Sequence, residues 1–127
     1  MANETLEERK LKVLERYVDY ARTRDSSQYI TNEDAMSAAR QLGELRSKPA
    51  VELLVQSILV TDSFDAGVTF RKALEAIGRP ALMTIETAIS KSGFGGFRIY
   101  PGGPQRNHLL TAKENILSAL RSQMKPS

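Results

Sequence analysis

The sequence predicts an all-α fold of about six helices, arranged as one domain over its 127 residues. Apolar residues recur at helical spacing in successive stretches, and glycine, proline and short polar segments separate these stretches. The hydrophobic fraction of 41% is ordinary for a globular protein, and the chain is long enough to bury a core without metal or disulfide support.

The first helix is expected over about residues 4–24. Asn3 or Thr5 can cap it, and acidic residues in its first turn suit the positive end of the helix dipole. Its apolar stripe consists of Leu6, Val13, Leu14, Tyr17, Val18 and Ala21. A polar connection over residues 25–28 then leads to a second helix that begins near Thr31 or Asn32.

The second and third helices are both predicted from one-sided apolar patterns. The apolar face of the second helix consists of Ala35, Ala38, Ala39, Leu42 and Leu45. Most of these residues are small, which lets a neighbouring helix approach closely. The third helix begins at Pro49, whose missing N–H costs nothing in a first turn. Its i, i+3, i+4, i+7, i+8 pattern is the clearest helical signal in the chain: Val51, Leu54, Val55, Ile58 and Leu59.

The fourth and fifth helices meet at a sharp corner. Asp62 or Ser63 can cap the fourth helix, which ends at Gly78, and Pro80 opens the fifth. The inward-facing residues are Phe70, Ala73, Leu74 and Ile77 on the fourth helix and Leu82, Ile85, Ala88 and Ile89 on the fifth. Because Gly78-Arg79-Pro80 leaves no room for a loop, we expect these two helices to form an antiparallel hairpin.

A glycine- and proline-rich loop is predicted over residues 92–106. Its glycines and prolines exclude a continuous helix there. The helical period returns near Gln105, and residues 107–127 are assigned to a last helix that caps the stack.

Two segments of the chain share one pattern. In Ala38–Leu54 and in Ala73–Ile85, an alanine-rich helix ends in Leu-Gly or Ile-Gly, and Pro-Ala starts the next helix. This pattern resembles HEAT repeats of the kind found in phycobilisome lyase-like repeat proteins. The resemblance implies a short right-handed α-solenoid, with residues 1–31 as an N-terminal capping helix and linker and residues 32–91 as two helical repeats. Arg46-Ser47-Lys48 departs from the pattern, because Gly-Asp or Gly-Asn is usual at that turn.

The residues that usually carry catalysis are scarce. There is no cysteine, and His108 is the only histidine. A lone histidine at a helix start is interpreted as a surface residue. The acidic pairs Glu33/Asp34 and Asp62/Asp65 lie at helix N-termini, where capping explains them. We therefore predict no enzyme, no metal site and no cofactor.

The loop before the last helix supplies the candidate binding surface, which combines aromatic and basic residues: Phe94, Phe97, Arg98, Tyr100, Arg106 and His108. The simpler interpretation, which we favour, is that the aromatic residues fold back and cover the open end of the stack. A second possible groove involves Tyr17 and Tyr20 on the first helix and Tyr29-Ile30 before the second, although Tyr17 also fits the buried stripe.

The predicted function is a non-catalytic protein-interaction module, with self-association as one form of it. The alternative is nucleic-acid binding through the basic C-terminal third, since residues 64–127 carry 9 basic and 4 acidic residues, a net +5, against −2 for residues 1–63. A chromophore lyase-like binding protein is a distant alternative that only the resemblance implies. No apolar run or signal-like N-terminus indicates a membrane partner, so a cytoplasmic protein is the default expectation, with a trimmed exported protein as the other.

Overall fold

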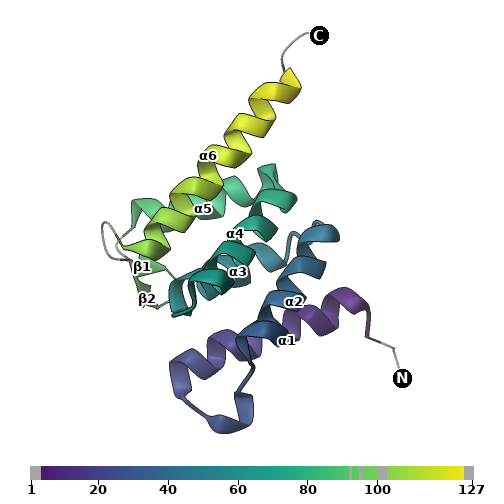
Figure 1. Cartoon of the computed structure of the whole chain (residues 1–127), viewed down its shortest axis with the longest axis vertical. Helices are drawn as coiled ribbons and strands as arrows, with labels where there is room; N and C mark the ends of the chain where they lie inside the picture. Colours follow the sequence, from purple (N-terminus) through teal and green to yellow (C-terminus); the bar gives the residue numbers. More distant parts are fainter. Residues whose placement is uncertain (1–3, 92, 95, 100–102, 125–127) are drawn as a thin grey trace.

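The computed structural model describes residues 4–91, 93–94, 96–99 and 103–124 (Figure 1). Over these residues the chain forms six α-helices, which confirms the predicted all-α class and the number of helices. In chain order they are α1 (Leu6–Thr23), α2 (Asn32–Glu44), α3 (Ala50–Val60), α4 (Phe64–Ile77), α5 (Leu82–Ser90) and α6 (Pro104–Met124). The shorter elements are the 3₁₀ turns η1 (Ser26–Gln28) and η2 (Arg79–Ala81) and the strands β1 (Gly93–Phe94) and β2 (Phe97–Arg98).

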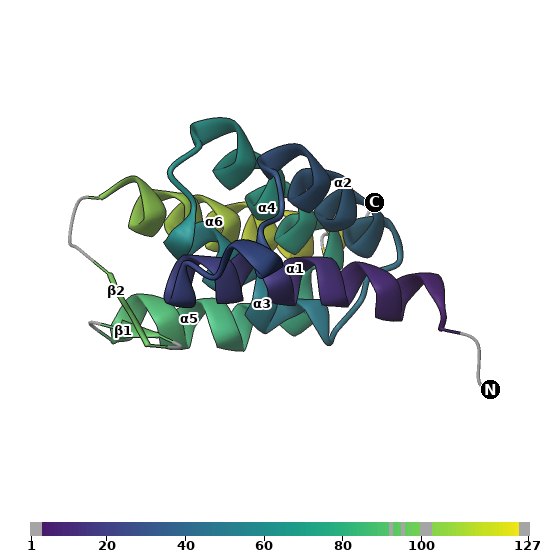
Figure 2. The same cartoon turned by 90° about the horizontal axis from the view of Figure 1, so that it is seen from below.

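The helices form two layers. Figure 2 shows α1, α3 and α5 in one layer and α2, α4 and α6 in the other. Across the layers, α1 contacts α2, α3 contacts α4 and α5 contacts α6. Within the layers, α1 contacts α3, α3 contacts α5, α2 contacts α4 and α4 contacts α6, and the contact between α2 and α4 is the most extensive.

The predicted hairpin of α4 and α5 is wrong. These two helices make at most marginal contact, and so do α2 and α3. Gly78 adopts a positive φ of 80°, and η2 then carries the chain from one layer to the other. The apolar face of α4 is already covered by α2, α3 and α6, so little of it remains for α5. A tight corner fixes where a helix ends, whereas burial decides which helix it packs against.

Side-chain caps begin three of the helices at predicted positions. The hydroxyl of Thr5 accepts a hydrogen bond from the backbone N–H of Glu8, and that of Thr31 accepts one from Asp34. Ser63 caps α4 in the same way, so the cap is Ser63 and not the alternative Asp62, and α2 begins at the predicted Asn32. The other candidate cap of α1, Asn3, lies outside the described residues. The last helix begins at Pro104, earlier than predicted, because proline is well tolerated in a first helical turn.

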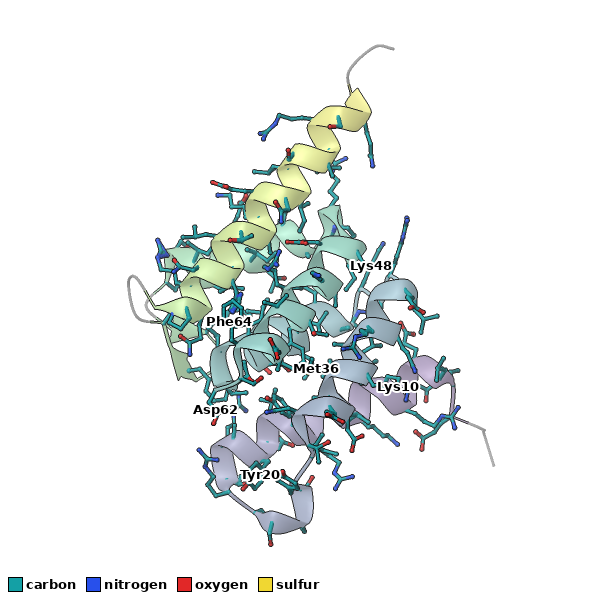
Figure 3. All side chains as sticks on the ribbon, in the orientation of Figure 1. Lys10, Tyr20, Met36, Lys48, Asp62 and Phe64 are labelled. Carbon is teal, nitrogen blue, oxygen red and sulfur yellow. The ribbon has the colours of Figure 1, made fainter. Side chains whose placement is uncertain are left out.

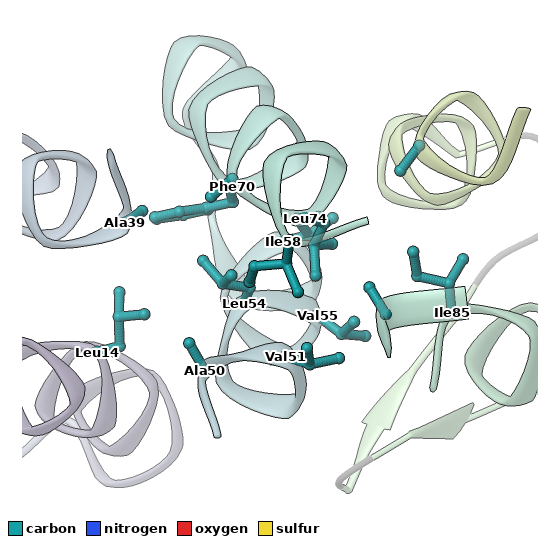
Figure 4. Packing of buried hydrophobic residues seen from close by; sticks show 14 of the residues in the cluster. Leu14, Ala39, Ala50, Val51, Leu54, Val55, Ile58, Phe70, Leu74 and Ile85 are labelled. Atoms are coloured by element: carbon teal, nitrogen blue, oxygen red, sulfur yellow. The ribbon is translucent and has the colours of Figure 1, made fainter. Parts of the chain in front are cut away.

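The core lies between the two layers. Figure 4 shows Leu14 of α1, Ile58 of α3, Phe70 of α4 and Ile85 of α5 pointing into it, and each of these side chains is fully buried. Small residues set the spacing of α2 and α4 as the sequence predicts. A methyl group added to Gly43 would lie 3.1 Å from Cα of Ala73.

The C-terminus of α2 closes without glycine. The N–H of Arg46 donates to the carbonyl of Gly43, and the N–H of Ser47 donates to the carbonyl of Leu42. These two bonds form a Schellman motif, in which the residue after the cap is left-handed. Arg46 fills that position with a φ of 53°, which costs a non-glycine residue free energy.

Candidate functional site

The loop predicted as the binding surface is partly folded onto the protein. Gly93 pairs with Arg98 and Phe94 pairs with Phe97 in a short antiparallel hairpin. Phe94 and Phe97 are half-buried and pack against the core, and Ile99 is buried. This placement agrees with the interpretation that the aromatic residues cover the open end of the stack.

Two basic side chains support this covering arrangement. The guanidinium of Arg22, on α1, lies 4.9 Å from the centre of the Phe97 ring. The Nη1 atom of Arg106 lies 3.5 Å from the backbone carbonyl oxygen of Ile89 near the end of α5. The other two predicted residues, the side chain of Arg98 and all of Tyr100, lie outside the part that the structure describes.

The interpretation of His108 as a surface residue is wrong, because its side chain is only 9% exposed. The imidazole packs directly over Gly67 of α4, where an added methyl group would lie 2.7 Å from Nε2. On its outer side it contacts the ring of Phe64, with 5.4 Å between the ring centres. Burial lowers the pKa of His108, and the positive charge of Arg71 lowers it further, so the imidazole is neutral at pH 7.

Two small cavities flank the contact between Phe64 and His108. The first, of about 150 Å³, is named the histidine cavity and is lined by Ile58, Thr61, Asp62, Ser63, Phe64, Pro104, Gln105 and His108. The second, of about 250 Å³, is lined by Phe64, Val68, Arg71, Pro104, Asn107, His108 and Thr111. The Phe64 ring is 68% exposed and lines both, so a partner could contact it and both cavities at once.

A third cavity, of about 310 Å³, contains the tyrosines that the sequence suggests as a groove. It is named the tyrosine cavity and is lined by Tyr17, Tyr20, Ala21, Arg24, Tyr29, Ile30, Asn32, Val60 and Asp62. The Tyr17 hydroxyl is hydrogen-bonded to Oδ1 of Asn32 and to Oγ1 of Thr61, each at 2.7 Å. Tyr17 is therefore both a core residue, as predicted, and a wall of this cavity.

Electrostatics and aromatic contacts shape the tyrosine cavity. Burial raises the pKa of Tyr17, its hydrogen bond to Thr61 opposes this, and the negative charge of Asp62 adds to the increase. The rings of Tyr20 and Tyr29 meet edge to face with 5.2 Å between their centres. Tyr29 is 55% exposed, so part of this aromatic pair is open to a partner.

These three cavities lie along one edge of the molecule, which we call the turn edge, whereas larger hollows of about 550 Å³ along α6 and about 390 Å³ between α2 and α4 lie elsewhere. It comprises the connection between α1 and α2 (residues 24–31), the connection between α3 and α4 (Thr61–Ser63) with Phe64, and the start of α6. Asp62 lines both the tyrosine cavity and the histidine cavity, so the two cavities are neighbours. Figure 3 shows Tyr20, Asp62 and Phe64 following one another along this edge.

Phe64 is the important residue that the sequence analysis missed, although a signal was present. The apolar stripe of α4 runs through Phe70, Ala73, Leu74 and Ile77, and Phe64 lies off that stripe. A large aromatic residue outside the apolar stripe of a helix is expected to face solvent. The contact of His108 with Gly67 had no such signal, because it joins residues that are distant in sequence.

The walls of the three cavities on the turn edge combine aromatic and apolar side chains with polar and charged ones, a mixture that is also found at protein interfaces. Among the described residues, no group of three or more acidic or histidine side chains is placed to hold a metal ion. No described helix is long and apolar enough to cross a membrane. Comparison of the chain with protein-family models, curated proteins and solved structures gave no match.

Proposed function

We propose that this protein is a non-catalytic protein-interaction module that binds a protein partner along the turn edge. The observation that carries the proposal is that two large aromatic side chains, Tyr29 and Phe64, stand exposed beside cavities on the same edge. Aromatic residues dominate the energy of protein interfaces because each ring buries a large area with few rotatable bonds. A cavity beside each ring gives a partner side chain a place to enter.

We further propose that the fold is a short right-handed α-solenoid of the HEAT type. Its support is the contact pattern, in which each helix contacts the next one across the layers or the second next within its layer. The repeat units of this solenoid would be α1–α2, α3–α4 and α5–α6. They are shifted by one helix from the repeats that the sequence pattern suggests, and α1 and α6 become full members of repeats.

The proposal also explains why the turn edge differs from the rest of the surface. In stacked hairpins, the connections of successive repeats line up along one side. A partner lying along that side contacts several repeats at once, and each connection can vary without disturbing the core. Here the connections carry Tyr29, Asp62 and Phe64, whereas most of the apolar residues on the helices are buried.

The test compares partner capture by the wild type and by a double variant, Tyr29→Ser/Phe64→Ser, which we call the edge variant. The bait is immobilised, exposed to nuclease-treated lysate of the source cells, and the captured proteins are quantified by mass spectrometry. We expect at least one partner to be captured by the wild type and reduced roughly tenfold or more by the edge variant, since truncating a hot-spot residue costs about 2 kcal/mol or more.

Met83→Ser is the matched control, because Met83 is 80% exposed and lies on α5 away from the turn edge. Circular dichroism and thermal unfolding serve to check that the wild type, the edge variant and Met83→Ser are all folded before their captured proteins are compared. A partner retained equally by the edge variant would contradict the proposal. Capture seen only in a parallel experiment with lysate that has not been treated with nuclease would instead support the alternative prediction of nucleic-acid binding.

A further inference from the structure

The turn edge carries an excess of negative charge. Five exposed carboxylates lie on its connections and on the first turns that follow them: Asp25, Glu33, Asp34, Asp62 and Asp65. None of the five makes an ion pair with another described residue. The guanidinium groups on or beside this edge are those of Arg24, which lies over Tyr20, Arg16, which donates to the carbonyl of Ser27, and Arg106, which donates to the carbonyl of Ile89. The edge is therefore acidic although the whole chain carries +3.

Local structure explains most of these carboxylates, but it does not explain Asp62. Glu33, Asp34 and Asp65 lie in the first turns of α2 and α4, where they stabilise the helix dipole. Asp25 accepts hydrogen bonds from the N–H and hydroxyl of Ser27. Asp62 precedes the capping residue of α4 and makes no hydrogen bond to a described residue, yet it lines both cavities.

The tyrosine cavity is suited to a cationic group. Aromatic ring faces attract ammonium and guanidinium groups, and a nearby carboxylate strengthens that attraction. The protein already shows one such contact, because the guanidinium of Arg24 lies 5.6 Å from the centre of the Tyr20 ring. The exposed part of the Tyr29 ring and the carboxylate of Asp62 offer an aromatic ring and a negative charge to a second cation. The influence of Asp62 on the pKa of Tyr17 indicates that its negative charge acts within this cavity.

The cavity volume indicates what can enter. About 310 Å³ is at the lower end of the size of small-molecule pockets, roughly 300–1,000 Å³. The neighbouring histidine cavity is smaller and has apolar walls from Ile58, Phe64 and Pro104. A segment of extended chain that passes over Asp62 can place one side chain in each cavity.

We propose that the partner presents a basic peptide segment to the turn edge, with an arginine or lysine side chain in the tyrosine cavity beside Asp62. An apolar side chain of the same segment occupies the histidine cavity against Phe64. This inference rests on the proposed function and names the chemistry of the partner that the turn edge recognises. The five carboxylates of the turn edge attract the positive charges of the partner's basic segment. This attraction favours basic partners and makes the affinity decrease as the salt concentration rises.

The test uses a displayed library of random dodecapeptides, which requires no knowledge of the natural partner. The library is selected on the wild type, and the enriched peptides are then titrated against Asp62→Asn, the edge variant and Glu52→Gln. Glu52 is an exposed carboxylate on α3 and serves as the charge-matched control. We expect enriched peptides to contain arginine or lysine. We expect Asp62→Asn to weaken their binding roughly tenfold, which is about 1.4 kcal/mol, since it removes a charged hydrogen-bond acceptor.

The outcomes separate this inference from the function on which it rests. Enriched peptides without basic residues that still lose binding to the edge variant would overturn the inference and leave the interaction function standing. Basic peptides that bind Asp62→Asn as tightly as the wild type would also overturn it. If no peptide binds the wild type better than the edge variant, both proposals fail. A peptide resembling the basic C-terminal segment of this chain would identify a second copy as the partner, which analytical ultracentrifugation would then show as self-association.

Discussion

Replacing Gly67 with alanine should destabilise the protein through a contact with His108. The added methyl group would lie 2.7 Å from Nε2 and 2.9 Å from another ring atom of His108, well inside normal contact distance. The ring cannot move freely, because it is buried and Phe64 lies against its other side. Overpacking of this kind costs about 1–3 kcal/mol in a well-packed core. Alanine is favoured over glycine within a helix by up to about 1 kcal/mol, and Gly67 lies within α4. We therefore expect Gly67→Ala to lower the free energy of unfolding by a net amount of up to about 2 kcal/mol.

The assay is urea unfolding followed by circular dichroism at pH 7.5, for the wild type, Gly67→Ala, His108→Ala and the double variant. His108→Ala removes the ring and leaves a cavity, whereas the double variant places the new methyl group in that space. The double variant should thus be at least as stable as His108→Ala alone, giving a coupling energy of about 1–3 kcal/mol between the two positions, in which the helix propensity of alanine cancels. Strictly additive effects would refute the packing argument.

Two further predictions concern stability. Burial and Arg71 lower the pKa of His108 in the folded protein, so below about pH 6.5 the unfolded chain binds a proton that the folded protein does not. The free energy of unfolding of the wild type, measured relative to that of His108→Gln, should therefore be highest above that pH and should decrease as the pH falls below it. A difference between the two proteins that does not change between about pH 5 and pH 8 would contradict this expectation. Arg46→Gly should stabilise the protein by up to about 1 kcal/mol, because Arg46 is exposed and has a left-handed φ of 53°, which glycine adopts without strain. An unchanged or lower urea midpoint for this variant would show that Arg46 is not strained in this conformation.

The local features of the fold could be predicted from the sequence, whereas contacts between distant residues could not. Thr5, Thr31 and Ser63 cap helices at predicted positions because a cap depends on residues within one turn. The packing partner of α4 is set by burial against three other helices, and the corner at Gly78 carries no information about it.

The candidate site shows the same division between local and distant information. The tyrosines that line one cavity could be suggested from the sequence, because two of them lie on one helix and the third lies in the short connection just before the next helix. Burial of His108 depends on the absence of a side chain at Gly67, which lies on another helix. A lone histidine in the sequence has no pattern that reveals such a contact, so the histidine cavity emerged only from the structure.

Core residues hold the parts of the turn edge in place. Tyr17 packs edge to face against Phe70 in the core, with 5.6 Å between the ring centres. Its hydroxyl is bonded to Asn32 at the start of α2 and to Thr61, whose Oγ1 also accepts from the N–H of Ser63. One buried hydroxyl therefore ties the first connection to the second.

His108 completes this arrangement at the other end of the edge. Its contact with α4 fixes the start of α6 beside Phe64, so the three parts of the turn edge are held relative to one another by side chains that also belong to the core. A surface fixed in this way loses little conformational entropy when a partner binds, and its binding energy then depends on the exposed groups at the edge. Substitutions of Tyr29, Asp62 and Phe64 should accordingly change affinity with little effect on stability, whereas substitutions of Tyr17, Gly67 and His108 should change both together.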